Sequence, residues 1–239
     1  MRPKNILFIS HNCEINGAVK VLLELVRFWK VKKEVSFDFL FGDPINDSLL
    51  KDFSDCGQIY RTRSITKIHP DSYDLIFNNT IANGWILRDL EPKNVPVVTY
   101  VHEMEFAIRS MKPSLIRGSL EYTKHFIACS DKVGENLQNL FKISKKRISV
   151  VHGFIDFKTP INNFATHKIE EEDNPFVIGI LANMDYRKGI DRFLSILPFI
   201  PSTISCRKVS WIWCGQGAKF YSHFIAESCK DRVSMLGSR

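Results

Sequence analysis

The sequence lacks any apolar run long enough to cross a membrane: no stretch of its 239 residues approaches the roughly 18 apolar residues of a spanning helix. Its start, MRPKNILFIS, holds an apolar run of only four residues, which is too short for the core of a signal peptide. C-x-x-C pairs are also absent. The six cysteines are Cys13, Cys56, Cys129, Cys206, Cys214 and Cys229. We therefore expect reduced thiols in a cytoplasmic protein.

The sequence also lacks a recognisable nucleic-acid-binding module, although it is basic, with a formal net charge of +7. The basic residues are scattered and form short clusters only at Lys30–Lys33 and Lys145–Arg147. Such an excess fits an ordinary solvated surface, a phosphate-bearing ligand or an anionic membrane surface. The scattered placement of the basic residues and the lack of a binding module argue against nucleic acid as the partner.

Short apolar segments alternate with amphipathic segments along most of the chain. Continuous apolar runs are typical of strands buried on both faces of a parallel sheet, and their alternation with helices predicts a doubly wound α/β fold. The expected strands are 5–10, 35–41, 73–79, 95–102, 125–130, 147–153, 176–182, 208–215 and 232–237. The expected helices are 18–29, 48–54, 81–90, 131–141, 189–199 and 218–229.

A polar segment at 158–174, KTPINNFATHKIEEEDN, interrupts this alternation. A surface loop would have a similar composition, but a new series of strands and helices begins directly after the segment, which favours a linker between domains. We predict a Rossmann-like domain over 1–157, a linker over 158–174, and an incomplete second Rossmann-like domain over 175–239.

The residues that follow each strand are the candidates for a site, because ligands of open parallel sheets bind beyond the carboxyl ends of the strands. Gly17 stands at the first helix start, where we expect a positive φ or a close approach to an anion. Asn79 also precedes a helix, and capping is its alternative role. His102 and Glu103 follow the fourth strand, where the alternative is a histidine satisfied within a polar loop. Ser130, or the residue after it, is expected to cap a helix.

A second group of candidates lies in the second series. Arg187 and Lys188 stand at a strand-to-helix junction, where cations are unfavourable unless an anion binds. A diphosphate meets that requirement, and two solvated side chains are the alternative. Gly215 and Gly217 follow the next strand and permit a close approach of the backbone to a nucleotide.

Taken in order, these segments resemble the family 4 glycosyltransferases, which are retaining enzymes of the GT-B fold that use nucleotide-activated sugars. The resemblance runs through NGAVKVLLEL, VPVVTYVHEMEF, FIACSDKVGENLQNLF, RISVVHGFID, GILANMDYRKGIDRFL, WIWCGQG and RVSMLG, over nearly the whole chain. The VHE and RKGIDRFL segments look like those of bacterial surface-polysaccharide sugar transferases.

The resemblance implies an acceptor-side first domain and a second domain that binds the nucleotide sugar. It implies that Gly17 lies against the donor phosphates or sugar, and that His102 contacts the sugar near the reacting carbon as the catalytic residue. Lys188, with Arg187 as a weaker candidate, would hold the diphosphate, and the two glycines of WIWCGQG would line the nucleotide site. The expected contacts to the acceptor or the sugar are Asn79, Glu103 and Ser130.

The resemblance also bears on cofactors and partners. No Asp-x-Asp motif is present, in agreement with the metal-independent GT-B pattern, and no cofactor is expected besides the nucleotide-sugar substrate. The expected acceptor is a glycan or a lipid-linked glycan, with the protein bound peripherally at the inner face of the cell membrane.

The chain departs from the family pattern in its second half. Ala182 and Asn183 stand where the family often has a Gly-Arg pair, so that one cation is missing or is replaced by Arg187. The family's E-x(7)-E motif is absent, and the chain ends at Arg239, before the region where that motif occurs. We therefore expect a truncated donor domain, with apolar faces that a partner chain or a second copy would cover.

The sequence also bears on two other functions. The missing glutamate motif favours a non-catalytic accessory module or pseudoenzyme, whereas the retained His102 and Lys188 favour an enzyme. A dinucleotide-dependent oxidoreductase is disfavoured, because no G-x-G-x-x-G follows the first strand.

Overall fold

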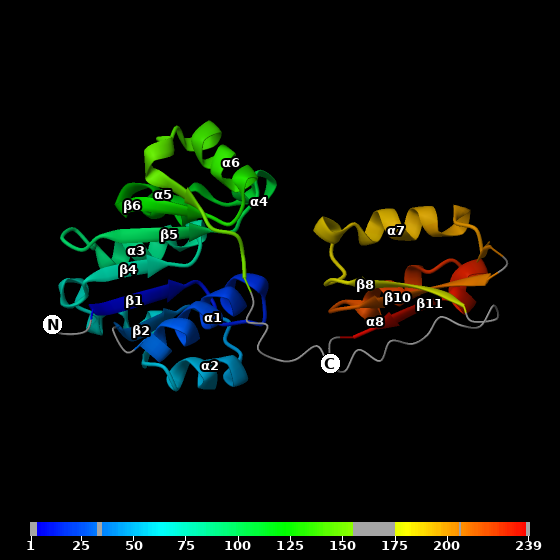
Figure 1. The fold of residues 1–239 in the computed structure, drawn as a ribbon, viewed down its shortest axis with the longest axis horizontal. Coiled ribbons are helices and arrows are strands. Elements are labelled where there is room, and N and C mark those ends of the chain that lie inside the picture. Colours follow the sequence, from blue (N-terminus) through cyan, green and yellow to red (C-terminus); the bar gives the residue numbers. More distant parts are fainter. Residues whose placement is uncertain (1–3, 33–34, 155–174, 206, 238–239) are drawn as a thin grey trace. The chain divides into compact units, whose positions relative to one another are not determined.

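The computed structural model describes residues 4–32, 35–154, 175–205 and 207–237 (Figure 1). The chain divides into two compact units, Met1–Pro160 and Ile161–Arg239, which are called the first and second units and are described separately. The predicted linker at 158–174 lies outside the described residues, so the expected domain boundaries stay a prediction. No described helix is long and apolar enough to span a membrane.

The first unit is built on a seven-stranded sheet in the order β3-β2-β1-β4-β5-β6-β7, and all of its neighbouring strands are parallel. The strands are β1 (Lys4–Ser10), β2 (Val35–Phe41), β3 (Gln58–Arg61), β4 (Leu75–Asn78), β5 (Val97–Val101), β6 (Thr123–Ala128) and β7 (Ile148–Val150). The helices are α1 (Gly17–Lys32), α2 (Asp47–Ser54), α3 (Gly84–Leu90), α4 (Glu105–Ser110), α5 (Pro113–Tyr122) and α6 (Asp131–Phe141). The predicted doubly wound parallel sheet is confirmed, and its strand order reverses between β1 and β4.

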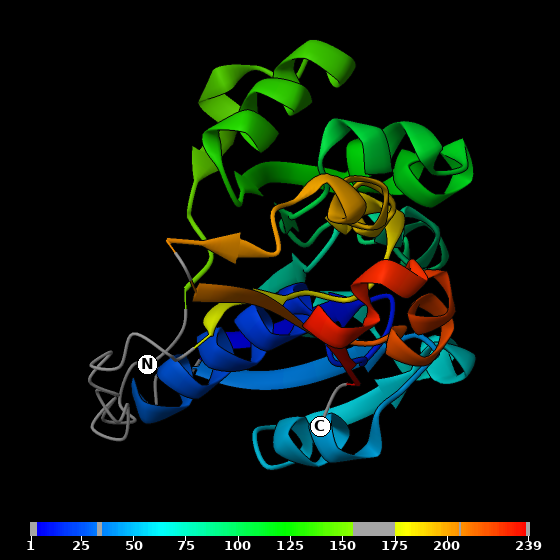
Figure 2. The ribbon, with the colours of Figure 1, turned by 90° about the vertical axis from the view of Figure 1, so that its right-hand side faces the viewer.

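Both faces of this sheet are covered, which explains why its strands are apolar along their whole length. Phe8 of β1 packs in one buried cluster with Leu22 of α1, whereas the next residue, Ile9, packs in another with Ile86 of α3. Successive side chains of a strand point to opposite faces, so each face receives every second residue. Helix α6 packs against β6 and β7 at one edge of the sheet. Figure 2 shows the same ribbon from the side.

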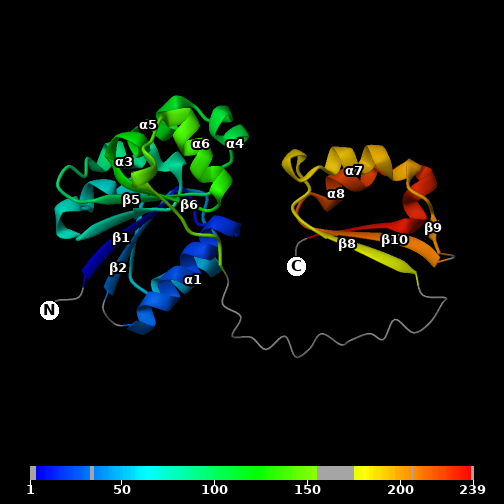
Figure 3. The same cartoon turned by 45° about the horizontal axis from the view of Figure 1, so that its top comes forward.

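The second unit has a smaller sheet in the order β11-β10-β8, with a short antiparallel strand, β9, beside β10. Its elements are β8 (Phe176–Leu181), α7 (Ile190–Ile196), β9 (Thr203–Ile204), β10 (Arg207–Cys214), α8 (Ala218–Tyr221) and β11 (Val233–Leu236). Helices α7 and α8 lie on the same side of the sheet (Figure 3). On that side Trp213 is 2% exposed and packs edge-on against Phe193, with ring centroids 5.2 Å apart.

The other face of the second sheet carries exposed apolar side chains. Val177, Leu181 and Leu236 point away from the buried cluster and are 52%, 90% and 44% exposed. They alternate along their strands with Ile178 and Val233, which lie on the covered side. The described part of the second unit therefore buries only one face of its sheet.

The predicted helices of the second unit are shorter in the structure. The helix expected over 189–199 begins at Ile190, because Gly189 is left-handed (φ 76°), and a 3-10 turn that contains Pro198 follows it. The helix expected over 218–229 is α8 followed by two 3-10 turns, which are separated by extended backbone at Ile225 and Ala226. In the first unit, the strand β3 and the helices α4 and α5 were not predicted.

Candidate functional site

The carboxyl ends of β1 and β4 meet where the strand order reverses, which is where doubly wound sheets bind ligands. Helix α1 begins there, and Asn16 caps it by accepting a hydrogen bond of 3.0 Å from the Val19 N–H to its Oδ1. Gly17 follows the cap. The expected positive φ at Gly17 was wrong, but a Cβ at this position would meet no atom within 4 Å. The start of α1 therefore faces open space.

Asn79 joins this helix start to the end of β5. Its side chain is buried, and its Nδ2 donates to the Ala18 carbonyl oxygen at 3.1 Å. Its Oδ1 lies 3.2 Å from Nε2 of His102. The capping role that the sequence left open belongs to Thr80, whose Oγ1 accepts a hydrogen bond of 3.1 Å from the Ala82 N–H.

His102 lies in the polar turn after β5, against the ring of Tyr100, with ring centroids 4.2 Å apart. The Tyr100 hydroxyl donates to the Val151 carbonyl oxygen at 2.7 Å, which holds the ring that supports the imidazole. Burial lowers the pKa of His102 to about 4. The imidazole is therefore neutral at physiological pH, since the charged form loses more solvation on burial.

Glu103 uses both of its carboxylate oxygens within the protein. Its Oε2 accepts from the His102 N–H at 3.1 Å and from the Ile81 N–H at 3.5 Å, and its Oε1 accepts from the Thr80 hydroxyl. Burial raises the pKa of Glu103, and these hydrogen bonds oppose that effect. The carboxylate therefore ties the turn after β5 to the turn after β4.

The structure thus brings Asn79, His102 and Glu103 together, but it links Ser130 to none of them. Ser130 caps α6, and its Oγ accepts from the Val133 N–H at 3.3 Å. This is the capping role that the sequence predicted for Ser130 or its neighbour.

The sequence interpretation missed His11, which directly follows β1 at the point of strand-order reversal. Its Nδ1 is buried and has no hydrogen-bond partner among the residues that the structure describes. Burial lowers the pKa of His11, while the nearby Glu14 opposes the shift. The rule that selected His102, a polar residue at the carboxyl end of a strand, would also have found His11.

In the second unit, the two cations after β8 differ in their partners. They lie in a 3-10 turn, Tyr186–Lys188, which Asp185 caps by accepting from the Lys188 N–H at 3.2 Å. The Arg187 guanidinium pairs with Asp185 at 3.2 Å, whereas the Lys188 ammonium makes no ion pair or hydrogen bond with any described residue. Both side chains therefore precede α7 rather than begin it, and only Lys188 is free.

Gly215 and Gly217 are in close contact with the loop after β8. A Cβ on Gly215 would lie 1.9 Å from the Ala182 carbonyl oxygen, and one on Gly217 would lie 3.0 Å from the Met184 carbonyl oxygen. The Met184 N–H donates to the Gln216 carbonyl oxygen at 2.7 Å, so the two loops are also hydrogen-bonded. Packing of the protein against itself accounts for the absence of side chains at both positions.

Comparison with protein families gives a match over part of the chain. Residues 50–159 match the family described as Glycosyltransferase Family 4. In this segment the chain is similar to glycosyltransferase family 4. The match lies within the first unit and spans β3 to β7, including the turns that carry Asn79, His102 and Glu103.

Solved structures similar to this chain have the same GT-B-like fold. HepE from Anabaena, in complex with UDP and glucose, has a TM-score of 0.73 and 16% identity, over 99% of this chain and 70% of that chain. A glycosyltransferase from Rickettsia africae has a TM-score of 0.69 and 14% identity, over 100% and 69%. WaaG, a glycosyltransferase involved in lipopolysaccharide biosynthesis, has a TM-score of 0.63 and 11% identity, over 98% and 70%. No curated protein matches the sequence.

Among the described residues, no group of three or more His, Cys, Asp or Glu side chains could hold a metal ion. The five described cysteines are free, and Cys206 lies outside the described residues. Burial raises the pKa of Cys13 to about 11, so this thiol stays protonated at neutral pH.

Proposed function

We propose that the chain transfers a sugar from a nucleotide-sugar donor to a glycan or lipid-linked acceptor, with retention and without a metal ion, in surface-polysaccharide synthesis. The similarity of residues 50–159 to Glycosyltransferase Family 4 supports the use of a nucleotide sugar. The observation that carries the proposal further is the free ammonium group of Lys188, which projects from a capped turn between a strand and a helix.

The chemistry of the proposed reaction requires such a cation. When the glycosyl–phosphate bond breaks, negative charge accumulates on the departing diphosphate, and a fixed positive charge lowers the barrier. Arg187 is the weaker candidate, because Asp185 already neutralises its guanidinium. In the first unit, the open space at Gly17 leaves the N–H groups at the start of α1 accessible to a phosphate or a sugar hydroxyl.

Calorimetric titration of the protein with UDP-, GDP- and dTDP-sugars tests this proposal. UDP-glucose is the first choice, because the HepE structure holds UDP and glucose and a similar α-glucosyltransferase structure holds UDP-glucose. We expect Lys188→Ala to weaken binding on the order of 10- to 100-fold, which corresponds to a lost charge-assisted hydrogen bond.

The matched control for this titration is Lys208→Ala. Lys208 is also an exposed lysine of the second unit, and it has no ion pair within the described ranges. It lies near the amino end of β10, far along the strand from the loop with Gly215. We expect wild-type affinity in the control. Equal affinity of the Lys188→Ala variant and the wild type, or no affinity for any sugar of the panel, would contradict the proposal.

A non-catalytic accessory module is the second candidate function. The bare sheet face of the second unit, with Val177, Leu181 and Leu236 exposed, favours it, because a partner could cover this apolar surface. The same titration separates the two candidates: an accessory module predicts that Lys188→Ala leaves the protein's behaviour unchanged.

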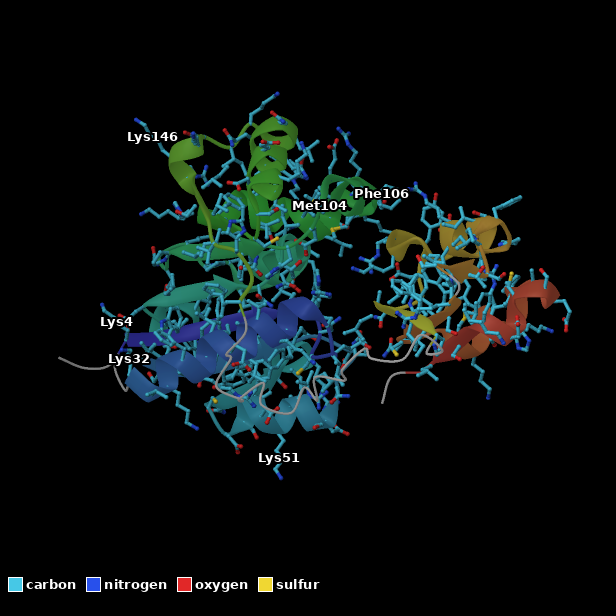
Figure 4. The ribbon with its side chains drawn as sticks, turned by 45° about the vertical axis from the view of Figure 1, so that its right-hand side comes forward. Lys4, Lys32, Lys51, Met104, Phe106 and Lys146 are labelled. Atoms are coloured by element: carbon cyan, nitrogen blue, oxygen red, sulfur yellow. The ribbon has the colours of Figure 1, made fainter. Side chains whose placement is uncertain are left out.

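We also propose that the first unit contacts an anionic membrane surface at the cytoplasmic face. Its surface carries exposed lysines, and Met104 and Phe106 beside the site are 49% and 65% exposed (Figure 4). An exposed apolar pair next to the site suits an acceptor that is anchored in lipid.

A further inference from the structure

We propose that Asn79 is a positioning residue that fixes the tautomer of His102, with the ring proton on Nε2 and a free acceptor at Nδ1. The ligand half of this inference rests on the proposed function: Nδ1 would accept a hydrogen bond from a hydroxyl group of the donor sugar. The tautomer half depends only on the contacts of the free protein.

The orientation of the Asn79 amide follows from its contact with helix α1. The Ala18 carbonyl oxygen can only accept a hydrogen bond, so the Asn79 atom that lies 3.1 Å from it is the amide nitrogen. The Asn79 N–H donates to the Ile9 carbonyl oxygen at 2.9 Å, so the main chain of this residue is also fixed. The side chain is buried, and its Oδ1 necessarily points the other way, towards His102.

The tautomer of His102 follows from that orientation. An amide oxygen can only accept, so Nε2 of His102, 3.2 Å from Oδ1, carries the proton. The ring is neutral at physiological pH, which leaves a lone pair on Nδ1. Nδ1 has no partner among the described residues, yet it is not among the buried unsatisfied atoms, so it is open to solvent.

Two further contacts keep the ring in place. Glu103 accepts the main-chain N–H of His102 at 3.1 Å, and Tyr100 supports one side of the imidazole. Rotation of the ring would break the bond to Asn79 and would leave its Oδ1 buried without a partner, which is unfavourable. These contacts therefore hold the open Nδ1 in one orientation.

The test is the long-range ¹H–¹⁵N spectrum of histidine-labelled full-length protein near neutral pH, with the His102 signals assigned from a His102→Gln variant. We expect the Nε2–H tautomer as the single major species in the wild type. Asn79→Leu has a similar shape but no acceptor, so the proton should move to the solvent-facing Nδ1, and the Nδ1–H tautomer should become the major species. Asn79→Asp keeps an acceptor and should keep the Nε2–H tautomer.

The outcomes separate this inference from the proposed function. An Nδ1–H tautomer in the wild type, or an unchanged tautomer in a folded Asn79→Leu variant, overturns it. If Asn79→Leu does not fold, the wild-type and Asn79→Asp spectra decide, because loss of the Nε2–H tautomer in either overturns the inference. Titration with UDP-glucose should shift the Nδ1 resonance, whereas UDP should not. Binding without that shift overturns the ligand half, and absence of binding refutes the proposed function but leaves the tautomer half standing.

Discussion

The polar side chains at the strand ends fall into two groups according to their partners within the protein. Asn79, Glu103 and Arg187 are already bound by protein groups. Within the described part of the chain, one ring nitrogen of His102 and the ammonium group of Lys188 have no partner. The sequence predicted all five as site residues, because each follows a strand. It could not separate the groups, since the partners come from distant segments: Glu103 bonds to Thr80, for example.

At this scale, the low pKa of His102 predicts a dependence of stability on pH. Burial lowers this pKa from 6.5 to about 4, so the unfolded chain binds a proton that the folded chain does not bind as the pH falls through that window. His102 should therefore reduce the free energy of unfolding by about 2 kcal/mol between about pH 7 and pH 5. Chemical denaturation of the wild type and of a His102→Gln variant at the two pH values measures this change in the free energy of unfolding.

The comparison with the variant is necessary because His11 is shifted in the same direction and Glu103 in the opposite one. Both groups remain in His102→Gln. The difference in pH-dependent stability between the two proteins is therefore the contribution of the His102 imidazole. The same loss of stability on acidification in both proteins would show that His102 titrates as an exposed histidine.

At the scale of elements, the predictions succeeded for helices and strands that bury apolar side chains. They failed for elements whose buried residues are small or polar. The strand expected at 35–41 and the helix expected at 131–141 match β2 and α6. Helix α5 was missed because its buried residues are Gly118 and Ser119, which give no apolar periodicity. A Cβ on Gly118 would lie 2.0 Å from the Gly84 carbonyl oxygen, so this helix uses glycine to approach α3 closely. Strand β3 is an edge strand with half-buried residues, and it lacks an apolar run.

The close approach of the two loops in the second unit predicts a structural role for Gly215. We expect Gly215→Ala to destabilise this unit by about 1–3 kcal/mol, because the new Cβ would overlap the Ala182 carbonyl oxygen. Thermal unfolding followed by the fluorescence of Trp211 and Trp213 measures the effect. Gly179→Ala in β8 is the matched control, since its Cβ would meet no atom within 4 Å, and its effect should be small.

This experiment also tests the nucleotide role that the resemblance implies for Gly215. A Gly215→Ala protein with wild-type stability but weaker binding of a nucleotide sugar would show that the glycine makes room for a ligand rather than for its own chain. Loss of stability in the Gly179→Ala control would show that the second unit does not tolerate any added methyl group.

At the scale of the whole molecule, the net charge of +7 is spread over many elements. Lys4, Lys32, Lys51 and Lys146 project from β1, α1, α2 and the turn before β7, and Figure 4 shows them on different parts of the first unit. Dispersed cations attract an anionic surface through long-range fields, which salt screens beyond about 8 Å at physiological ionic strength.

Liposome flotation checks the proposed membrane contact. We expect binding to vesicles that contain anionic lipid at low salt, weaker binding at physiological salt, and no binding to neutral vesicles. No binding to anionic vesicles at low salt would refute a membrane contact of the described surface. Equal binding to neutral vesicles would show that the exposed Met104 and Phe106, rather than charge, drive the association.

The sequence by itself determined the parallel α/β architecture, because strands buried on two faces must be apolar throughout and must alternate with helices. It also determined the candidate positions, since every strand end is visible in the sequence. Only the tertiary structure decided which of these side chains are free. Hydrogen bonds between turns distant in sequence join Asn79 to His102 and Thr80 to Glu103, and they leave Nδ1 of His102 open. Such pairings depend on which strands become neighbours, and no local pattern of residues records that order.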